Sequence, residues 1–223
     1  EGHISAITVR PGVLNRDQRI ALVPDVPFVM EPERVSTVAY AKALFTHRLE
    51  ESGVQNEFCR RVLDKLHEDF TLKELHQVLL ASGLTETSDA TAVWAARGIL
   101  MLAESNFEVL FPATSLLSQR ILFPAAPSQS NGIEDARFVQ FHNDDGTSVY
   151  YATYTAYDGK SIQPQLLETS DFLRFRFRSL SGPAVQNKGM ALFPRRINGR
   201  YAMLSRQDDE NILLMFSDSL LYW

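Results

Sequence analysis

The second half of the chain, residues 107–223, is a succession of short apolar runs separated by turn sequences. The runs recur about every ten residues, and Asn143–Gly146 and Asn198-Gly199 have the composition of hairpin turns. A Ser-Asp pair follows an apolar run at residues 170–171 and again 47 residues later. That separation is close to the ~40–50 residues of one propeller blade. The pattern predicts a β-sandwich, barrel or propeller for residues 107–223.

Residues 36–106 have instead the periodicity of amphipathic helices. Apolar residues recur at every fourth position from Val54 to Phe70, which predicts one face of a helix. Thr71–Glu74 has the sequence of a capping box, and another helix is expected to start there. We therefore expect a helical subdomain of four helices over residues 36–106. The caps expected for the first and fourth helices are Ser36 and either Ser88 or Asp89.

Residues 1–35 contain two apolar runs, Ile4–Val9 and Ile20–Val23, with Pro11-Gly12 between them. Further prolines follow the second run, so this part is expected to be an extended lead-in with two strand-like pieces. The sequence as a whole predicts an α+β chain. Its parts would be this lead-in, the helical subdomain, and the β domain from residue 107 onward.

The composition argues against several classes of protein. A net charge of −5 and a pI near 5.6 argue against a general nucleic-acid-binding protein. No apolar run approaches the roughly 20 residues that span a bilayer, and the first residues lack the features of a signal peptide. Cys59, the single cysteine, is expected to be a buried apolar residue. A cytoplasmic setting is therefore the default expectation, with no membrane partner.

No sequence motif for a cofactor or a metal ion is present. The histidines lack the spacing of a zinc site, and the chain contains no glycine-rich nucleotide-binding motif. We therefore expect no metal site and no cofactor.

The segment from Gly132 to Arg137 places two acids and a base at the start of an apolar run. Because strand side chains alternate between faces, Asp135 and Arg137 are expected on one face and Glu134 on the other. A carboxylate beside an arginine at a strand end is a candidate chemical site. It is also a common surface ion pair, worth at most about 1 kcal/mol. The local pattern leaves both interpretations open.

Four segments in combination resemble glycoside hydrolase family 130, the β-mannoside phosphorylases and related mannosidases. They span residues 120–223, and the helical portion resembles more loosely the N-terminal region of a longer branch of that family. The four segments are Gly132-Ile133-Glu134-Asp135-Ala136-Arg137, Tyr151–Gly159, Asn187-Lys188-Gly189-Met190-Ala191-Leu192-Phe193-Pro194 and Asn198–Arg206.

The resemblance implies a five-bladed β-propeller with the active site at its central cavity. It also implies inverting phosphorolysis of a β-mannoside oligosaccharide, in which inorganic phosphate is the co-substrate and α-mannose 1-phosphate is released. Asp135 would supply the proton to the departing sugar oxygen, directly or through a sugar hydroxyl. Lys188 and Arg206 would hold the phosphate. The candidate sugar contacts are Glu134, Arg137, Tyr151 and Tyr154, although core packing is an open alternative for both tyrosines.

Departures from the family pattern keep other functions open. Ala136, Gly189 and Ser205 stand where Pro, Asp and His are usual in the family. The absence of a second carboxylate in a matching motif favours phosphorolysis over hydrolysis, because an inverting hydrolase needs such a group to activate water. The alternatives are a β-mannosidase of the same family and a non-catalytic carbohydrate-binding or assembly protein.

The number of residues also bears on the fold. Five blades at ~40 residues need about 200, whereas residues 107–223 number 117. We therefore expect a fragment with two to three blades. An open propeller exposes strand edges that favour pairing, so a homo-oligomer is expected.

Overall fold

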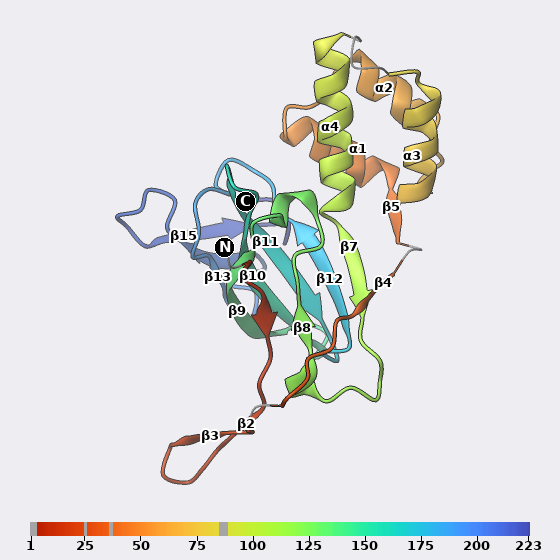
Figure 1. The fold of residues 1–223 in the computed structure, drawn as a ribbon. Coiled ribbons are helices and arrows are strands. Elements are labelled where there is room, and N and C mark those ends of the chain that lie inside the picture. Colours follow the sequence, from red (N-terminus) through yellow and green to blue (C-terminus); the bar gives the residue numbers. More distant parts are fainter. Residues whose placement is uncertain (1–3, 25, 36–37, 85–88) are drawn as a thin grey trace.

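The computed structural model describes residues 4–24, 26–35, 38–84 and 89–223. The chain is mixed α and β, and sheets predominate. Figure 1 shows the helices grouped together beyond the ends of β7 and β12, beside the main sheet. The helices are α1 (Lys42–Glu51), α2 (Glu57–Asp64), α3 (Leu72–Ala81) and α4 (Ala90–Glu104), and the short 3-10 helices are η1 (Leu117–Gln119) and η2 (Pro127–Gln129).

The main sheet has six antiparallel strands in the order β4-β7-β12-β11-β10-β9. A second sheet has three antiparallel strands in the order β13-β14-β15. The strands of the main sheet are β4 (Glu33–Arg34), β7 (Phe107–Leu110), β9 (Ile133–His142), β10 (Ser148–Tyr157), β11 (Ile162–Thr169) and β12 (Arg174–Ser179). Those of the second sheet are β13 (Ala191–Leu192), β14 (Tyr201–Ser205) and β15 (Leu213–Ser217).

Both faces of the main sheet are apolar, and each contributes to a different core. One face carries Ala152, Leu167, Phe175 and Phe177, which are buried in one cluster. The other face carries Phe141 and Leu166, which are buried with residues of the second sheet. The second sheet therefore packs on one face of the main sheet, beside β9 and β10.

Arg and Phe alternate between the two faces of strand β12. Phe175 and Phe177 are fully buried, while Arg174 and Arg176 point the other way and form ion pairs with Glu108 at 2.9 and 2.8 Å. Phe172 breaks the alternation and packs on the phenylalanine side. The reason is its φ of +57°, which turns the chain just before the strand begins.

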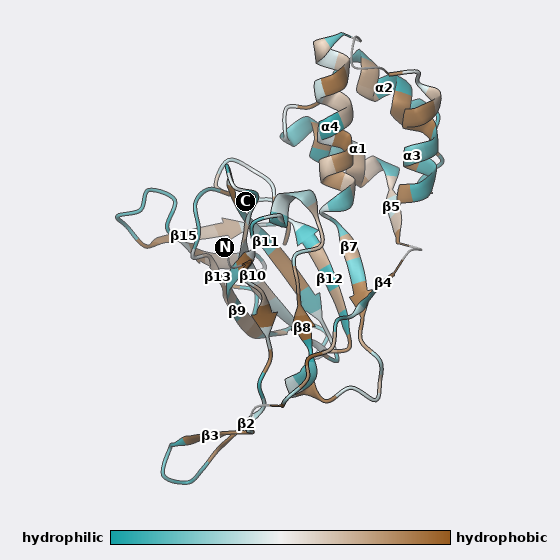
Figure 2. Cartoon of the chain, in the orientation of Figure 1, coloured by the Kyte–Doolittle hydropathy of each residue, from teal (hydrophilic) through white to brown (hydrophobic). Residues whose placement is uncertain are grey.

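The N-terminal residues form two short antiparallel strand pairs. Strand β1 (Ile7–Thr8) pairs with β8 (Ile121–Leu122), and β2 (Gly12–Leu14) forms a hairpin with β3 (Ile20–Leu22). The β2–β3 hairpin projects away from the body of the molecule (Figure 1), and its apolar side chains are exposed; Figure 2 colours β3 as hydrophobic. Of the two expected strand-like pieces, the first is shorter than expected and the second forms β3.

The helices are close to the expected spans, with two corrections. The first helix, expected to begin at a cap on Ser36, begins at Lys42 with Ala41 at its N-cap, because Ala39–Ala41 forms strand β5. The second helix was expected to continue to Phe70, but α2 ends at Asp64, and Phe70 lies in strand β6 (Asp69–Thr71). Strand β6 pairs with β5 (Ala39–Ala41), which stacks the ring of Phe70 on that of Tyr40 at 5.5 Å. This tertiary packing overrides the local helical period.

The helix caps were partly as expected. The capping box of Thr71 and Glu74 is present at the start of α3. The side chain of Asp89 accepts a hydrogen bond from the backbone N–H of Thr91 at the start of α4, whereas Ser36 and Ser88 lie outside the described residues. Cys59 is fully buried, as expected for an apolar position. Among the helices of the described ranges, none has both the length and the hydropathy required to cross a bilayer.

Asn106 joins the helical region to the main sheet. It lies between α4 and β7, and its amide donates to Leu102 O at 2.6 Å and to Ser179 Oγ at 3.2 Å. Its side-chain oxygen accepts from Arg48 Nη1 at 2.9 Å and from the backbone N–H of Ser179 at 3.0 Å. One buried amide therefore bonds to α1, α4 and β12.

We expect Asn106→Ala to lower the free energy of unfolding by about 2–3 kcal/mol, because it leaves buried donors without their acceptor. Urea denaturation measures this. Asn211→Ala is the matched control, since Asn211 is exposed and hydrogen-bonds only near its own turn; its effect should stay within about 0.5 kcal/mol. Equal effects of the two substitutions would contradict the role given to Asn106.

Candidate functional site

A β-bulge interrupts the pairing of β9 with β10 at the candidate acid. Thr153 pairs with Arg137 and Thr155 pairs with Glu134, so Asp135 and Ala136 together lie opposite a single residue. Asp135 has a φ of +57°, in the left-handed region that glycine usually occupies at the first position of one type of bulge. Aspartate is among the few other residues that tolerate this conformation. Such strained positions are concentrated at functional sites.

The bulge corrects the expected arrangement of the three charged residues. Directly opposite residues of paired strands share a face, and Thr153 and Thr155 lie on one face of β10. Glu134 and Arg137 therefore share that face, contrary to the expectation that they would lie on opposite faces of the strand. The extra residue of the bulge reverses the alternation between positions 134 and 137.

Arg137 extends from this face to the segment before β13. Its Nη1 donates a hydrogen bond to Gly189 O at 3.1 Å. A Cβ atom added to Gly189 would lie 3.4 Å from Arg206 Cδ and 3.5 Å from Arg137 Nη2. The two arginines thus pass beside the same glycine, one from each sheet.

Lys188 completes a group of three cations. Its Nζ lies 3.8 Å from Glu134 Oε1, and both side chains are about half exposed. Glu134, Arg137, Lys188 and Arg206 are therefore close together at a solvent-exposed position, where β9 approaches the segment 187–189. Asp135 is exposed at the start of the same strand.

Two further residues hold this segment in place, and the sequence analysis did not identify them. Asn187 has a φ of +60°, and its amide donates to Arg206 O at 2.9 Å and to the carboxylate of Asp209. Thr153 is buried and donates through Oγ1 to Met190 O at 2.5 Å. The residue type alone could have indicated the turn at Asn187, because Asn tolerates positive φ. Thr153 gave no local signal.

Tyr154 is a core residue in this structure. It is 2% exposed, and its hydroxyl donates to Gln165 Oε1 at 2.5 Å and accepts from Gln129 Nε2 at 2.9 Å. Burial raises the pKa of Tyr154 well above its usual value. Neither face of its ring reaches solvent, so Tyr154 cannot stack on a sugar in this structure. Of the two interpretations of this residue, core packing is therefore the one that holds.

Tyr151 lies on the same face of β10 as Thr153. It is partly buried, and its ring meets that of Phe141 edge to face at 5.6 Å. Burial, followed by the nearby carboxylate of Glu168, raises the pKa of Tyr151 to about 12. Its hydroxyl therefore stays protonated at neutral pH.

Ser205 occupies one of the positions where the sequence departs from the family pattern. It is 1% exposed, and its Oγ has no hydrogen-bond partner within the described chain. The residue precedes Arg206 at the end of β14. A buried hydroxyl without a partner is rare, because its desolvation is not compensated.

The charges of this site suit an oxyanion. Arginine can bind a phosphate through two parallel hydrogen bonds, and a lysine adds a compact charge. In the described parts of the chain, no three residues among His, Cys, Asp and Glu are grouped so that they could hold a metal ion.

Comparison with known proteins identifies the family. A family model described as beta-1,4-mannooligosaccharide phosphorylase matches residues 111–223. The chain belongs to glycoside hydrolase family 130. The matched residues include every candidate residue of the site, whereas the four helices lie outside the match.

Individual relatives share part of the chain. The beta-1,2-mannobiose phosphorylase of Listeria innocua is 30% identical over 92 residues, which are 41% of this chain and 24% of that protein. The structure of that enzyme in complex with beta-1,2-mannobiose aligns with 45% of this chain and 28% of its own, at 30% identity and a TM-score of 0.37. The chain thus spans about a quarter of the length of the curated relative that it matches.

The bulge gives a first prediction for the site. Asp135→Gly should leave the free energy of unfolding unchanged or raise it by up to about 1 kcal/mol, because glycine adopts positive φ freely. Asp135→Val should lower it by about 1–3 kcal/mol, because a β-branched residue is strained there. Urea denaturation of both variants tests this.

The matched control is Gln140, an exposed residue of the same strand outside the bulge. At that position Val should be at least as stable as Gly, since valine favours strands and glycine weakens them. If the Gly and Val variants rank in the same order of stability at position 135 as at position 140, the result would contradict the bulge.

Tyr154→Phe should destabilise the protein by about 1–3 kcal/mol, because Gln129 and Gln165 lose the hydroxyl that joins them. Tyr157→Phe, at an exposed position of the same strand, should change stability by less than about 0.5 kcal/mol. Thermal and urea unfolding measure both. A neutral Tyr154→Phe substitution would argue against the buried hydroxyl network.

Proposed function

We propose that this chain carries the phosphate-binding and proton-donating part of an inverting β-mannoside phosphorylase. The products would be α-mannose 1-phosphate and a shortened acceptor sugar. The observation that carries the proposal is the convergence of Arg137 and Arg206 beside Gly189, with Lys188 next to it. Membership of the family supports the β-mannoside substrate class.

In this proposal, Arg206 and Lys188 hold inorganic phosphate, which is the co-substrate. One phosphate oxygen attacks the anomeric carbon of the mannosyl unit as the glycosidic C–O bond breaks. Asp135 delivers the proton that the departing oxygen needs, directly or through a sugar hydroxyl. Attack from the face opposite to the leaving group inverts the β-linkage and gives the α-phosphate.

Glu134 and Arg137 are proposed to orient the sugar. They share the face of β9 that meets the cation group, so a sugar held by them would lie beside the bound phosphate. Tyr151, two residues from Thr153 on the same face, is proposed as a further wall of the sugar site. No cofactor takes part in this reaction.

We also propose that the two sheets are neighbouring blades of a propeller. The backbone N–H of His142, at the end of β9, donates to Pro194 O just after β13 at 2.8 Å, and a parallel bridge joins His142 and Arg195. An edge strand of the main sheet thus meets β13, an edge strand of the second sheet. Edge strands that lie side by side are what a ring of blades around a central cavity requires.

Phosphate-dependent release of mannose 1-phosphate from β-1,2- and β-1,4-mannobiose tests the function. Asp135→Asn should lower kcat by about 10²–10⁴-fold, as expected for loss of a general acid. Arg206→Met and Lys188→Met should raise the KM for phosphate by about tenfold or more, because each removes a charge-assisted contact. Lys160→Met, at an exposed turn, should leave the kinetic constants unchanged.

Other outcomes would support different functions. Free mannose released without phosphate would identify the β-mannosidase alternative. Absence of turnover, together with retained sugar binding or self-association, would contradict the enzyme and favour the carbohydrate-binding or assembly protein.

A further inference from the structure

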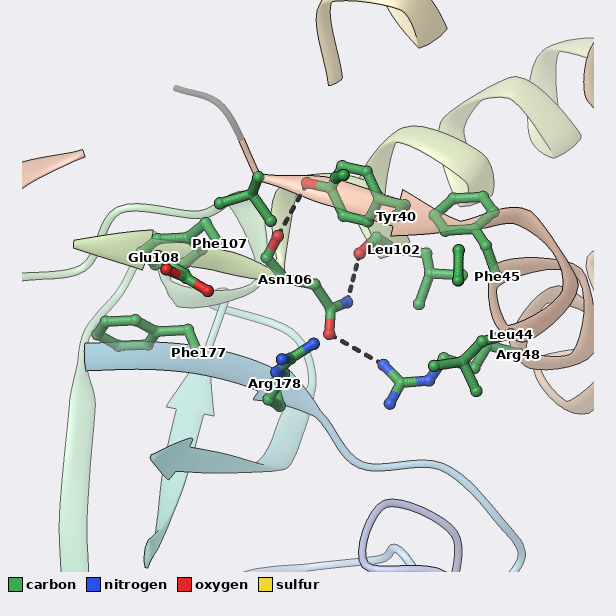
Figure 3. Close-up of a pocket in the computed structure, with 13 residues that line it drawn as sticks. Tyr40, Leu44, Phe45, Arg48, Leu102, Asn106, Phe107, Glu108, Phe177 and Arg178 are labelled. Carbon is green, nitrogen blue, oxygen red and sulfur yellow. Dashed lines mark hydrogen bonds between the residues drawn. The ribbon is translucent and has the colours of Figure 1, made fainter. Parts of the chain in front are cut away.

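A cavity of about 180 Å³ lies where the helical region meets the main sheet. Figure 3 shows its walls, which come from β5, α1 and the end of α4 on one side and from β7 and β12 on the other. Most of the wall is apolar, and the principal side chains are Phe45, Leu102, Phe107 and Phe177. Leu44, which is 49% exposed, stands at the edge of the cavity.

The guanidinium of Arg48 lies in this cavity without a full set of partners. Arg48 is only 6% exposed, and its Nη1 donates to Asn106 Oδ1 at 2.9 Å. Its Nη2 is buried and has no hydrogen-bond partner among the described residues. A buried cationic donor without an acceptor is costly, so its presence calls for a compensating group.

A second cation, Arg178, faces the same space from β12 (Figure 3). Its guanidinium forms no ion pair within the described ranges of the chain. Burial and the nearby Arg178 together lower the pKa of Arg48 to about 10. The two arginines therefore repel each other across a largely apolar cavity, and a negative group between them would relieve this repulsion.

The acidic side chains near the cavity bond to other groups, and Glu51 acts on Arg48 only through space, where it favours the charged guanidinium. Glu108 lines the wall, but its carboxylate is bound by Arg174 and Arg176 at 2.9 and 2.8 Å. Glu51 accepts a hydrogen bond from Ser181 Oγ at 2.7 Å and lies 3.0 Å from His47 Nε2. Neither carboxylate forms a hydrogen bond or ion pair with Arg48.

We propose that this cavity binds a small organic carboxylate whose apolar body is about the size of one ring. The carboxylate would accept hydrogen bonds from Arg48 Nη2 and from Arg178. The apolar body would lie among Phe45, Phe107 and Phe177. The volume is suitable, because an apolar cavity of about 150 Å³ accommodates benzene.

This site is separate from the one proposed for phosphorolysis. Arg178 pairs across β11 and β10 with Leu166 and Thr153, and Thr153 pairs with Arg137. The two arginines are thus three strand spacings apart, or about 14 Å. Because Arg48 and Asn106 connect the helices to β12, occupancy would also strengthen the joint between the two regions.

Isothermal titration and thermal unfolding with benzoate, benzamide and inorganic phosphate test the proposal on the whole chain. Benzamide is the neutral control of nearly equal shape. Benzoate should bind at least about tenfold more tightly than benzamide, because charged hydrogen bonds exceed neutral ones. Benzoate should also raise the unfolding midpoint.

Matched variants locate the ligand. Arg48→Met should reduce benzoate affinity about tenfold, and Arg178→Met should reduce it several-fold. Arg97→Met, at an exposed position of α4, should have no effect. If Arg48→Met fails to fold, Arg178, which is only partly buried, still gives the test.

Four results would overturn the proposal. One is equal binding of benzoate and benzamide, and another is the absence of benzoate binding. The third is a benzoate affinity that stays unchanged in the Arg178→Met variant and, if Arg48→Met folds, in that variant as well. Phosphate that binds as tightly as benzoate and competes with it would overturn the assignment of a carboxylate with an apolar body.

Discussion

The pairing of β9 with β10 is the constraint on which both cores and the candidate site depend. It places Ile133 and Ala152 in one core and Phe141 in the other. A regular ladder would have kept Asp135 and Arg137 on one face. The single extra residue of the bulge brings Arg137, together with Glu134, to the face where the second sheet contributes Lys188 and Arg206.

The joint at Asn106 has a comparable role for the helices. Its amide satisfies donors and acceptors from three elements in a place that water cannot easily reach. Such a network is most stable when all its members are satisfied, and Arg48 Nη2 has no hydrogen-bond partner in the described part of the chain. The same contact that fixes the helices therefore leaves a polar atom facing the adjoining cavity.

The structure shows the surroundings of two positions, 189 and 205, where the sequence departs from the family pattern. At position 189 a side chain would meet both Arg137 and Arg206, so glycine leaves room for them. At position 205 the serine is buried as the last residue of β14, and its hydroxyl lacks a partner within the described residues. Both differences lie next to a cation of the candidate site, since Gly189 follows Lys188 and Ser205 precedes Arg206.

The sequence by itself determined what depends on neighbouring residues. The capping box at Thr71, the Asn198-Gly199 hairpin turn and the alternation along β12 were predictable, because each follows from local hydrogen bonding or backbone conformation. The motif also indicated which charged residues belong to the candidate site. Only the tertiary structure decided the bulge at Asp135, the end of α2 before Phe70 and the burial of Tyr154. These depend on strand register and on packing between residues far apart in the chain, which no local pattern encodes.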